Sequence, residues 1–300
     1  MKGPLLITLL TLSVTGLAAS GYRFQDGASH TAIRFDLYRN LIVIPATVND
    51  TMKVRLILDT GTRSLLLYGS RFKTMQNLSA GRRLKIAGWG SPDGVDAQVS
   101  FPNDIKIGRV SGESLAMAVV SMRPLFHDDR SIDGIIGYDL FSTFVVEINY
   151  KTRTIHLYDQ LPCGYTEEFT SLPLEINKAM PQVKSTIILQ DKTRVEMRLL
   201  VDTGSSLGLT VFSKEKFTDQ SSDDSKPIGF GLNGVIEGFD LYLKQLFLGT
   251  VKVRSVPSYV VNVENHPDQN FTYCGSIGAA FLKRHIVVFD YPSSKLMLRS

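Results

Sequence analysis

Two aspartates that each end an apolar run are the residues in this sequence best suited to chemistry. Asp59 follows the run 53–58 and Asp202 follows the run 196–201, and each is continued by Thr and Gly. An ionised carboxylate at the end of an apolar strand is costly unless hydrogen bonds stabilise it. The threonine hydroxyl can hydrogen-bond locally, and the glycine lets the backbone turn and present an amide to the carboxylate. One such turn would be an ordinary Asx turn, but two after nearly identical runs indicate a site.

The two turns belong to a longer pattern that occurs twice at a nearly constant offset. Matching segments follow each other in the same order in both halves, which indicates a duplicated unit. The matched pairs are 53–64 with 196–207, Gly88-Trp89-Gly90 with Gly229-Phe230-Gly231, 105–108 with 246–249, 134–137 with 275–278, and 145–150 with 286–291.

Each copy consists of short runs rich in Val, Ile, Leu, Phe and Tyr between clusters of Gly, Pro, Asn and Asp, a pattern typical of strands. We therefore expect an all-β protein with two pseudo-symmetric, β-barrel-like lobes and a cleft between them. Strands are expected within 41–48, 183–189 and 239–248, and short helices within 139–144 and 279–285. The expected domains are a signal peptide at 1–20, a first lobe at 21–160 and a second lobe at 161–300.

Equivalent residues meet at a pseudo-twofold axis, so packing of the lobes about such an axis would place Asp59 and Asp202 side by side. Two carboxyls in contact share a proton, because one of the two pKa values is raised and the other is lowered; the aspartic-protease pair is the standard example of this effect. The ionised carboxylate can take a proton from a water that attacks an amide carbonyl. The protonated carboxyl can hydrogen-bond the developing oxyanion. This chemistry requires no cofactor, and the five histidines show no spacing typical of a metal site.

These residues resemble the aspartic peptidase family in its bilobal, single-chain form, related to pepsin and to the dimeric retroviral peptidases. The resemblance rests on the paired Asp-Thr-Gly turns and on the later segments 135–137 and 276–278, which cross beside the catalytic turns in that family. It implies that Thr60 and Thr203 bond across the lobe interface. Gly61, Thr62, Gly204 and Ser205 would complete the two turns.

The resemblance also implies a β-hairpin flap over the cleft. The candidates are Gly88, Trp89 and Gly90 in the first lobe and Gly229, Phe230 and Gly231 in the second. The flap of pepsin-like enzymes carries a Tyr near its tip, whereas this chain offers Trp89. Trp89 therefore has two alternative positions, at a flap tip or in the core of a lobe.

The N-terminus has the layout of a secretory signal peptide, with Lys2 before an apolar run from Leu5 to Ala19 that ends in small residues. We expect an exported protein, periplasmic or secreted, without stable membrane insertion after cleavage; an uncleaved signal, which would leave the protein associated with the membrane, is the alternative. In such a compartment Cys163 and Cys274 could form a disulfide or remain free thiols. The formal charge of +4 is spread along the chain, so nucleic acid is not an expected partner. The expected partner is a polypeptide substrate bound as an extended strand by a monomer.

Two other functions compete with a peptidase. Residues 204–208 match Gly-x-Ser-x-Gly, which would make Ser206 the nucleophile of a serine hydrolase, although the following Leu-Thr-Val-Phe predicts a strand where that motif requires a helix. A non-catalytic peptide-binding protein of the same fold is the other alternative. The presence of both aspartates favours the peptidase.

Overall fold

The structure is a computed structural model that describes residues 21–75, 78–86, 88–89, 94–120, 132–212, 217, 224–231, 234–253, 256–261 and 271–300. The expected signal peptide at 1–20 and Gly90 lie outside these residues. Within the described ranges, no helix is long and apolar enough to cross a membrane.

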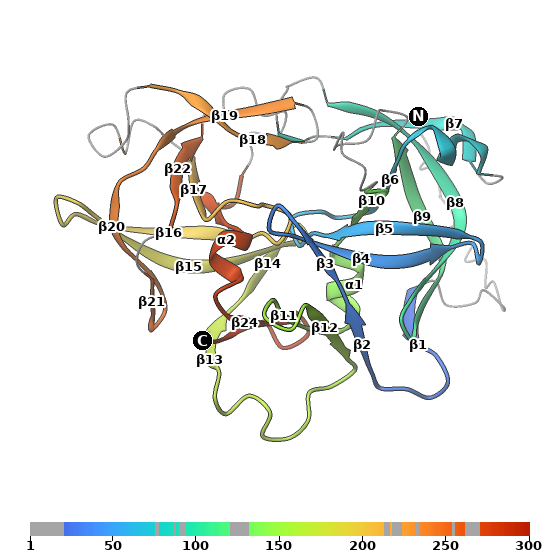
Figure 1. The fold of residues 1–300 in the computed structure, drawn as a ribbon, viewed down its shortest axis with the longest axis horizontal. Coiled ribbons are helices and arrows are strands. Elements are labelled where there is room, and N and C mark those ends of the chain that lie inside the picture. Colours follow the sequence, from blue (N-terminus) through green and yellow to red (C-terminus); the bar gives the residue numbers. More distant parts are fainter. Residues whose placement is uncertain are drawn as a thin grey trace, which may run out of the picture.

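The described chain folds into three β-sheets with two short α-helices, α1 (Tyr138–Thr143) and α2 (Ala279–Leu282), and one 3-10 helix, η1 (Ser70–Thr74). The all-β prediction is confirmed. In Figure 1 the first half of the chain, blue to green, forms the lobe on the right and the second half, yellow to red, the lobe on the left. The third sheet lies below and between them.

The first lobe contains a nine-stranded sheet in the order β1-β9-β6-β10-β5-β4-β8-β7, with β3 paired to β4. Its strands are β1 (Gly21–Phe24), β3 (Asp36–Tyr38), β4 (Leu41–Val48), β5 (Met52–Leu58), β6 (Leu65–Tyr68), β7 (Leu78–Ile86), β8 (Val95–Ile107), β9 (Val110–Val120) and β10 (Gly134–Ile136).

The second lobe contains a ten-stranded sheet in the order β18-β19-β22-β17-β23-β16-β15-β20-β21, with β14 paired to β15. Its strands are β14 (Glu175–Asn177), β15 (Met180–Leu189), β16 (Arg194–Val201), β17 (Leu209–Phe212), β18 (Lys226–Gly231), β19 (Gly234–Asp240), β20 (Leu243–Leu248), β21 (Val251–Val253), β22 (Ser258–Val261) and β23 (Gly275–Ile277).

The six-stranded third sheet combines strands from both halves in the order β13-β25-β24-β11-β12-β2. These are β2 (His30–Arg34), β11 (Val145–Asn149), β12 (Thr154–Tyr158), β13 (Thr170–Pro173), β24 (Ile286–Asp290) and β25 (Lys295–Arg299). The central pair β11 and β24 is antiparallel, with Val146 opposite Phe289 and Ile148 opposite Val287. All four of these side chains are fully buried in one core that extends into both lobes. Burial of apolar surface along this sheet therefore holds the two halves together.

One strand prediction is wrong in detail. The run 239–248 is not a single strand, because β19 ends at Asp240 and β20 begins at Leu243. β19 pairs with β22, whereas β20 pairs with β15, so the chain changes partners at this point. Leu241 is buried and donates its N–H to the carbonyl of Ser258 at 2.9 Å, while Tyr242 is exposed. The sequence is apolar along most of this run, but its two ends pair with different strands.

Of the two states considered for the cysteines, the structure has the free thiols: Cys163 and Cys274 are both exposed and form no disulfide. Cys274 is fixed between two strands of the second lobe, donating to Arg198 O and accepting from the N–H of Phe212. Cys163 lies in the turns between β12 and β13. The two cysteines therefore belong to different parts of the structure, a separation that their positions in the sequence could not show.

The third sheet carries a pair of histidines at its β12–β2 edge. His30 and His156 share a hydrogen bond of 3.0 Å between Nε2 and Nδ1, and both rings stack with Tyr158. The buried carboxylate of Glu147 lies opposite His156 on β11 and accepts a hydrogen bond from Tyr165. Burial lowers the pKa of His30 and the neighbouring His156 lowers it further, while Glu147 acts in the opposite direction.

This pair should make the stability of the protein depend on pH. Unfolded His30 titrates near its ordinary pKa of 6.5 and folded His30 titrates lower, so below about pH 6.5 the unfolded chain binds more protons and stability rises with pH. The contribution of neutral His30 to the free energy of unfolding is therefore fully present above about pH 6.5 and is lost as the pH falls below that value. Between about pH 7.5 and about pH 5.5, we expect the urea concentration at the unfolding midpoint to fall less in His30→Gln than in the wild type. An equal loss in both proteins would contradict this role.

Candidate active site

Both aspartates lie at the carboxyl end of a strand that is paired on one side with a parallel three-residue strand. β10 runs parallel to β5 with Ile136 opposite Leu58, and β23 runs parallel to β16 with Ile277 opposite Val201. The N–H of Asp59 donates to Ile136 O at 2.8 Å, and the N–H of Asp202 donates to Ile277 O at 2.9 Å. Both aspartates are therefore fixed by equivalent backbone bonds, one in each lobe.

Each carboxylate accepts a hydrogen bond from the glycine two residues later in its own turn. The Asp59 Oδ1 to Gly61 N distance is 2.7 Å, and the Asp202 Oδ1 to Gly204 N distance is 2.9 Å. A Cβ on Gly204 would lie only 2.2 Å from the Asp59 carboxyl carbon, and one on Gly61 would lie 3.0 Å from Asp202 Oδ1. Glycine is thus required at Gly204 because the carboxyl of the other lobe occupies that space.

The two segments that cross beside the turns also depend on close backbone approach. A Cβ on Gly137 would come within 2.2 Å of Asp59 O, and a Cβ on Gly278 within 2.6 Å of Ser205 O. Tyr138 and Ala279, the residues after these glycines, donate their N–H groups to Thr62 O and Ser205 O. Thr62 and Ser205 thus anchor the two turns through their carbonyls.

Thr60 and Thr203 join the lobes through reciprocal hydrogen bonds. The hydroxyl of Thr60 donates to Val201 O at 2.6 Å and accepts from the N–H of Thr203 at 3.0 Å. The hydroxyl of Thr203 donates to Leu58 O at 2.8 Å and accepts from the N–H of Thr60 at 3.0 Å. Both threonines are fully buried, so every one of these bonds satisfies a group that water cannot reach.

These bonds place the two carboxyls in contact. The side chains of Asp59 and Asp202 hydrogen-bond each other, and each remains partly exposed. Burial raises the pKa of Asp59, and the charge of Asp202 raises it further, to well above its ordinary range. Burial also raises the pKa of Asp202, while the hydrogen bond from Asp59 and those from Gly204 and Ser205 oppose the rise. The two carboxyls therefore titrate as one coupled pair, in which a single proton is shared.

Three buried tyrosines lie close enough to the carboxyl pair to respond to its charge. Burial raises the pKa of Tyr68, Tyr150 and Tyr291, and the aspartates raise it further. None of their hydroxyls has a hydrogen-bond partner among the described residues. Sequence reasoning did not select these residues, although Tyr150 and Tyr291 end the last pair of matching segments. A tyrosine at the same position in both copies was the available signal.

The candidate flap segments of the two lobes lie in hairpins that contact each other through Trp89 and Gly231. Gly88 and Trp89 lie between β7 and β8, whereas Gly229, Phe230 and Gly231 lie in β18, which pairs with β19. A Cβ on Gly231 would meet Trp89 O at 2.1 Å, so the first-lobe hairpin contacts the second-lobe hairpin. The indole of Trp89 lies 5.4 Å from the ring of Phe212 and stacks with that of Phe271 at 6.1 Å. Of the two positions considered from the sequence, Trp89 is not in the core of its own lobe: it lies in the β7–β8 hairpin, and its ring contacts the opposite lobe.

Trp89 is the only tryptophan of the chain, so its fluorescence reports this contact. We expect Phe271→Ala to shift the emission to longer wavelength, because the indole loses a stacked ring and gains water. Phe101→Ala, a change at an exposed phenylalanine of β8, is the matched control and should leave the emission unchanged. Identical emission from Phe271→Ala and wild type would show that the contact is not made in solution.

The turn at Ser206 does not provide the surroundings of a serine nucleophile. The backbone carbonyl of Ser206 accepts a hydrogen bond from Asn40, and the chain continues into the strand β17 instead of a helix. His285, a possible base, has Ser300 as its hydrogen-bond partner at 3.4 Å and packs on Phe281. Within the described ranges no group of three or more His, Cys, Asp or Glu side chains could hold a metal ion.

Comparison with known proteins agrees with this geometry. Residues 44–140 match the family model described as aspartyl protease, a segment that includes Asp59 and ends in α1. The fold is similar to the crystal structure of an aspartic proteinase from Irpex lacteus, with a TM-score of 0.62, 15% sequence identity, and coverage of 91% of this chain and 97% of that chain. No curated protein matches the chain.

The fold is that of the pepsin-like aspartic peptidases. The resemblance to the aspartic peptidase family expected from the paired Asp-Thr-Gly turns is confirmed, by the family match in the first lobe and by the fold over nearly the whole chain.

The reciprocal threonine bonds should make a large contribution to stability. Thr203→Val leaves Leu58 O and the N–H of Thr60 buried without partners, so we expect a loss of about 3 kcal/mol in the free energy of unfolding. Thr203→Ser keeps the hydroxyl and loses only a methyl group, so it should lose about 1 kcal/mol. Urea unfolding of the two variants measures the difference. Equal losses would show that the hydroxyl contributes nothing beyond its packing.

Proposed function

We propose that this protein is an aspartic-type endopeptidase that hydrolyses peptide bonds with a water activated by Asp59 and Asp202. The observation that carries the proposal is the hydrogen-bonded contact between the two carboxyls, one of which has a strongly raised pKa. Such a pair provides a proton donor and a proton acceptor at one point, as general acid–base catalysis requires. The family match and the fold support a peptidase of the aspartic type.

The mechanism uses one ionised and one protonated carboxyl. The ionised carboxyl of the pair accepts a proton from a water molecule, whose oxygen attacks the carbonyl carbon of the scissile amide. The protonated carboxyl hydrogen-bonds the carbonyl oxygen as negative charge develops there. Collapse of the tetrahedral intermediate breaks the C–N bond, and the proton taken from the water goes to the leaving nitrogen. The amides of Gly61 and Gly204 hold the carboxylates in place throughout.

We further propose that the substrate is a polypeptide bound in an extended conformation between the lobes, beneath the two hairpins. An extended chain can hydrogen-bond to strand edges through its backbone while its side chains enter pockets. The contact of Trp89 with Phe212 and Phe271 supports a covering role for the first-lobe hairpin. The enzyme would act as an exported monomer, periplasmic or secreted, without a cofactor.

Substitution of each aspartate tests the proposal. We expect Asp59→Asn and Asp202→Asn each to lower kcat/KM on a mixed peptide library by at least about 100-fold, because each removes one half of the proton transfer. Asp159→Asn, at an exposed aspartate in the turn after β12, is the matched control and should retain full activity. Thermal unfolding of all three variants checks that the fold persists.

The other outcomes distinguish the competing functions. Cleavage by either active-site variant at the wild-type rate would refute the mechanism, and blockage by a serine-directed reagent would favour Ser206. Peptide binding by the wild type without any cleavage between about pH 3 and about pH 8 would indicate a binding protein of the same fold.

A further inference from the structure

A cavity of about 400 Å³ in the first lobe is lined by an unusual excess of positive charge. It lies between the β2–β3 segment, the start of β4, β5 and the turn before β12. The lining residues are Arg34, Phe35, Asp36, Val43, Pro45, Arg55 and Arg153. Three arginines and one aspartate thus line the cavity, and none of these residues belongs to the Asp59 or Asp202 turns.

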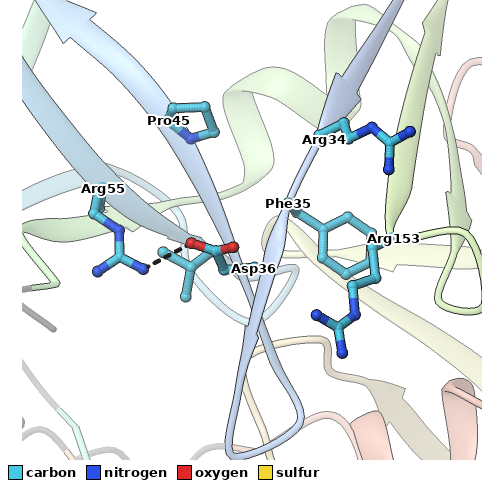
Figure 2. A pocket seen from close by; sticks show the side chains of 7 residues that line it. Arg34, Phe35, Asp36, Pro45, Arg55 and Arg153 are labelled. Carbon is cyan, nitrogen blue, oxygen red and sulfur yellow. Dashed lines mark hydrogen bonds and ion pairs between the residues drawn. The ribbon is translucent and has the colours of Figure 1, made fainter.

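The charges are arranged in two groups. Arg55 and Asp36 form an ion pair of 3.0 Å on one side of the cavity. Figure 2 shows Arg34 and Arg153 on the other side, with the ring of Phe35 between the two groups. Neither Arg34 nor Arg153 forms a side-chain ion pair or hydrogen bond with any residue that the structure describes. The cavity therefore retains two uncompensated guanidinium groups.

The position of both arginines is fixed by the backbone. Arg34 pairs with Thr154 at the end of β2, and the carbonyl of the adjacent Arg153 accepts a hydrogen bond from Phe35 N at 3.1 Å. Arg153 has a φ of 53°, in the left-handed region that residues with a Cβ seldom adopt. The turn and the strand end thus hold the two guanidinium-bearing residues at one edge of the cavity.

Strands β4 and β5 provide part of the lining of the cavity through Val43, Pro45 and Arg55. Val43 pairs with Asp36 of β3, but from Thr47 onward β4 pairs with Lys106 of β8. Pro45 lies between these two regions and is exposed. Pro45 is opposite Arg55 of β5 in the sheet, so these two lining residues are neighbours, and proline has no N–H to offer a strand on its other side. The apolar part of the lining is formed by Phe35, Val43 and Pro45.

We propose that this cavity is a second ligand site, which binds an oxyanion, a carboxylate or a phosphate, attached to an apolar group. Guanidinium groups bind both oxyanions through charge-assisted, bidentate hydrogen bonds. The apolar group would lie on Phe35, Val43 and Pro45, and the volume of the cavity falls in the range of small-molecule sites. Asp36 opposes the anion, since it is the one carboxylate in the lining.

The site is tested by calorimetric titration of the full chain at low salt with two probes, phenyl phosphate and benzylmalonate. We expect at least one of the two probes to bind, and the probe with the higher affinity shows whether the site prefers a phosphate or a carboxylate. The double variant Arg34→Gln/Arg153→Gln should bind it at least about tenfold more weakly. Asp36→Asn should bind it more tightly, because repulsion is removed. Arg109→Gln, at an exposed arginine of the same lobe outside the cavity, is the matched control and should bind like the wild type.

Three results would overturn the proposal: binding of neither probe, unchanged binding by the double variant, or equal binding of the neutral analogue benzyl alcohol. If inorganic phosphate binds as tightly as phenyl phosphate, the role assigned to the apolar wall is wrong. Arg34, Arg153 and Asp36 are exposed, so their substitution should leave the thermal midpoint unchanged, and that midpoint is measured for each variant.

Discussion

The structure depends on holding two carboxyl groups against each other where the two lobes meet. Each carboxyl would prefer water, and the contact between them is favourable only while they share a proton. The cost is offset by the reciprocal bonds of Thr60 and Thr203 and by the amides of Gly61 and Gly204. These groups satisfy one another across the lobe interface, so neither turn has its full set of partners without the other lobe.

The larger architecture keeps that contact rigid. Each turn is held by a parallel neighbouring strand on one side and by the crossing segment on the other, with glycines where backbones come closest. Beneath them, the sheet that contains β11 and β24 fixes the orientation of the lobes through buried apolar side chains. The aromatic contact of Trp89 with the second lobe adds a link on the opposite side. The carboxyl pair is thus held in place by contacts that join the two lobes.

Sequence was sufficient for the features that repeat. The paired turns and the strand periodicity led to the fold class, which the structure confirms, and to Asp59 and Asp202, which it places in contact. Features that depend on pairing between distant segments were not predictable. The change of partner at Leu241 is invisible in an apolar run, the separation of Cys163 from Cys274 depends on the fold, and the position of Trp89 depends on how the lobes meet. The three arginines around Phe35 come from separate segments and form no motif.

The sheet shared by both halves has a consequence for biosynthesis. β2, β11 and β12 are made early, but the partners of β11 in this sheet include β24, which follows every strand of both lobes along the chain. During synthesis, the edge of β11 that pairs with β24 therefore stays without its partner strand until β24 has been made. The sheet that fixes the orientation of the two aspartate-bearing lobes is therefore completed only when the chain is almost finished.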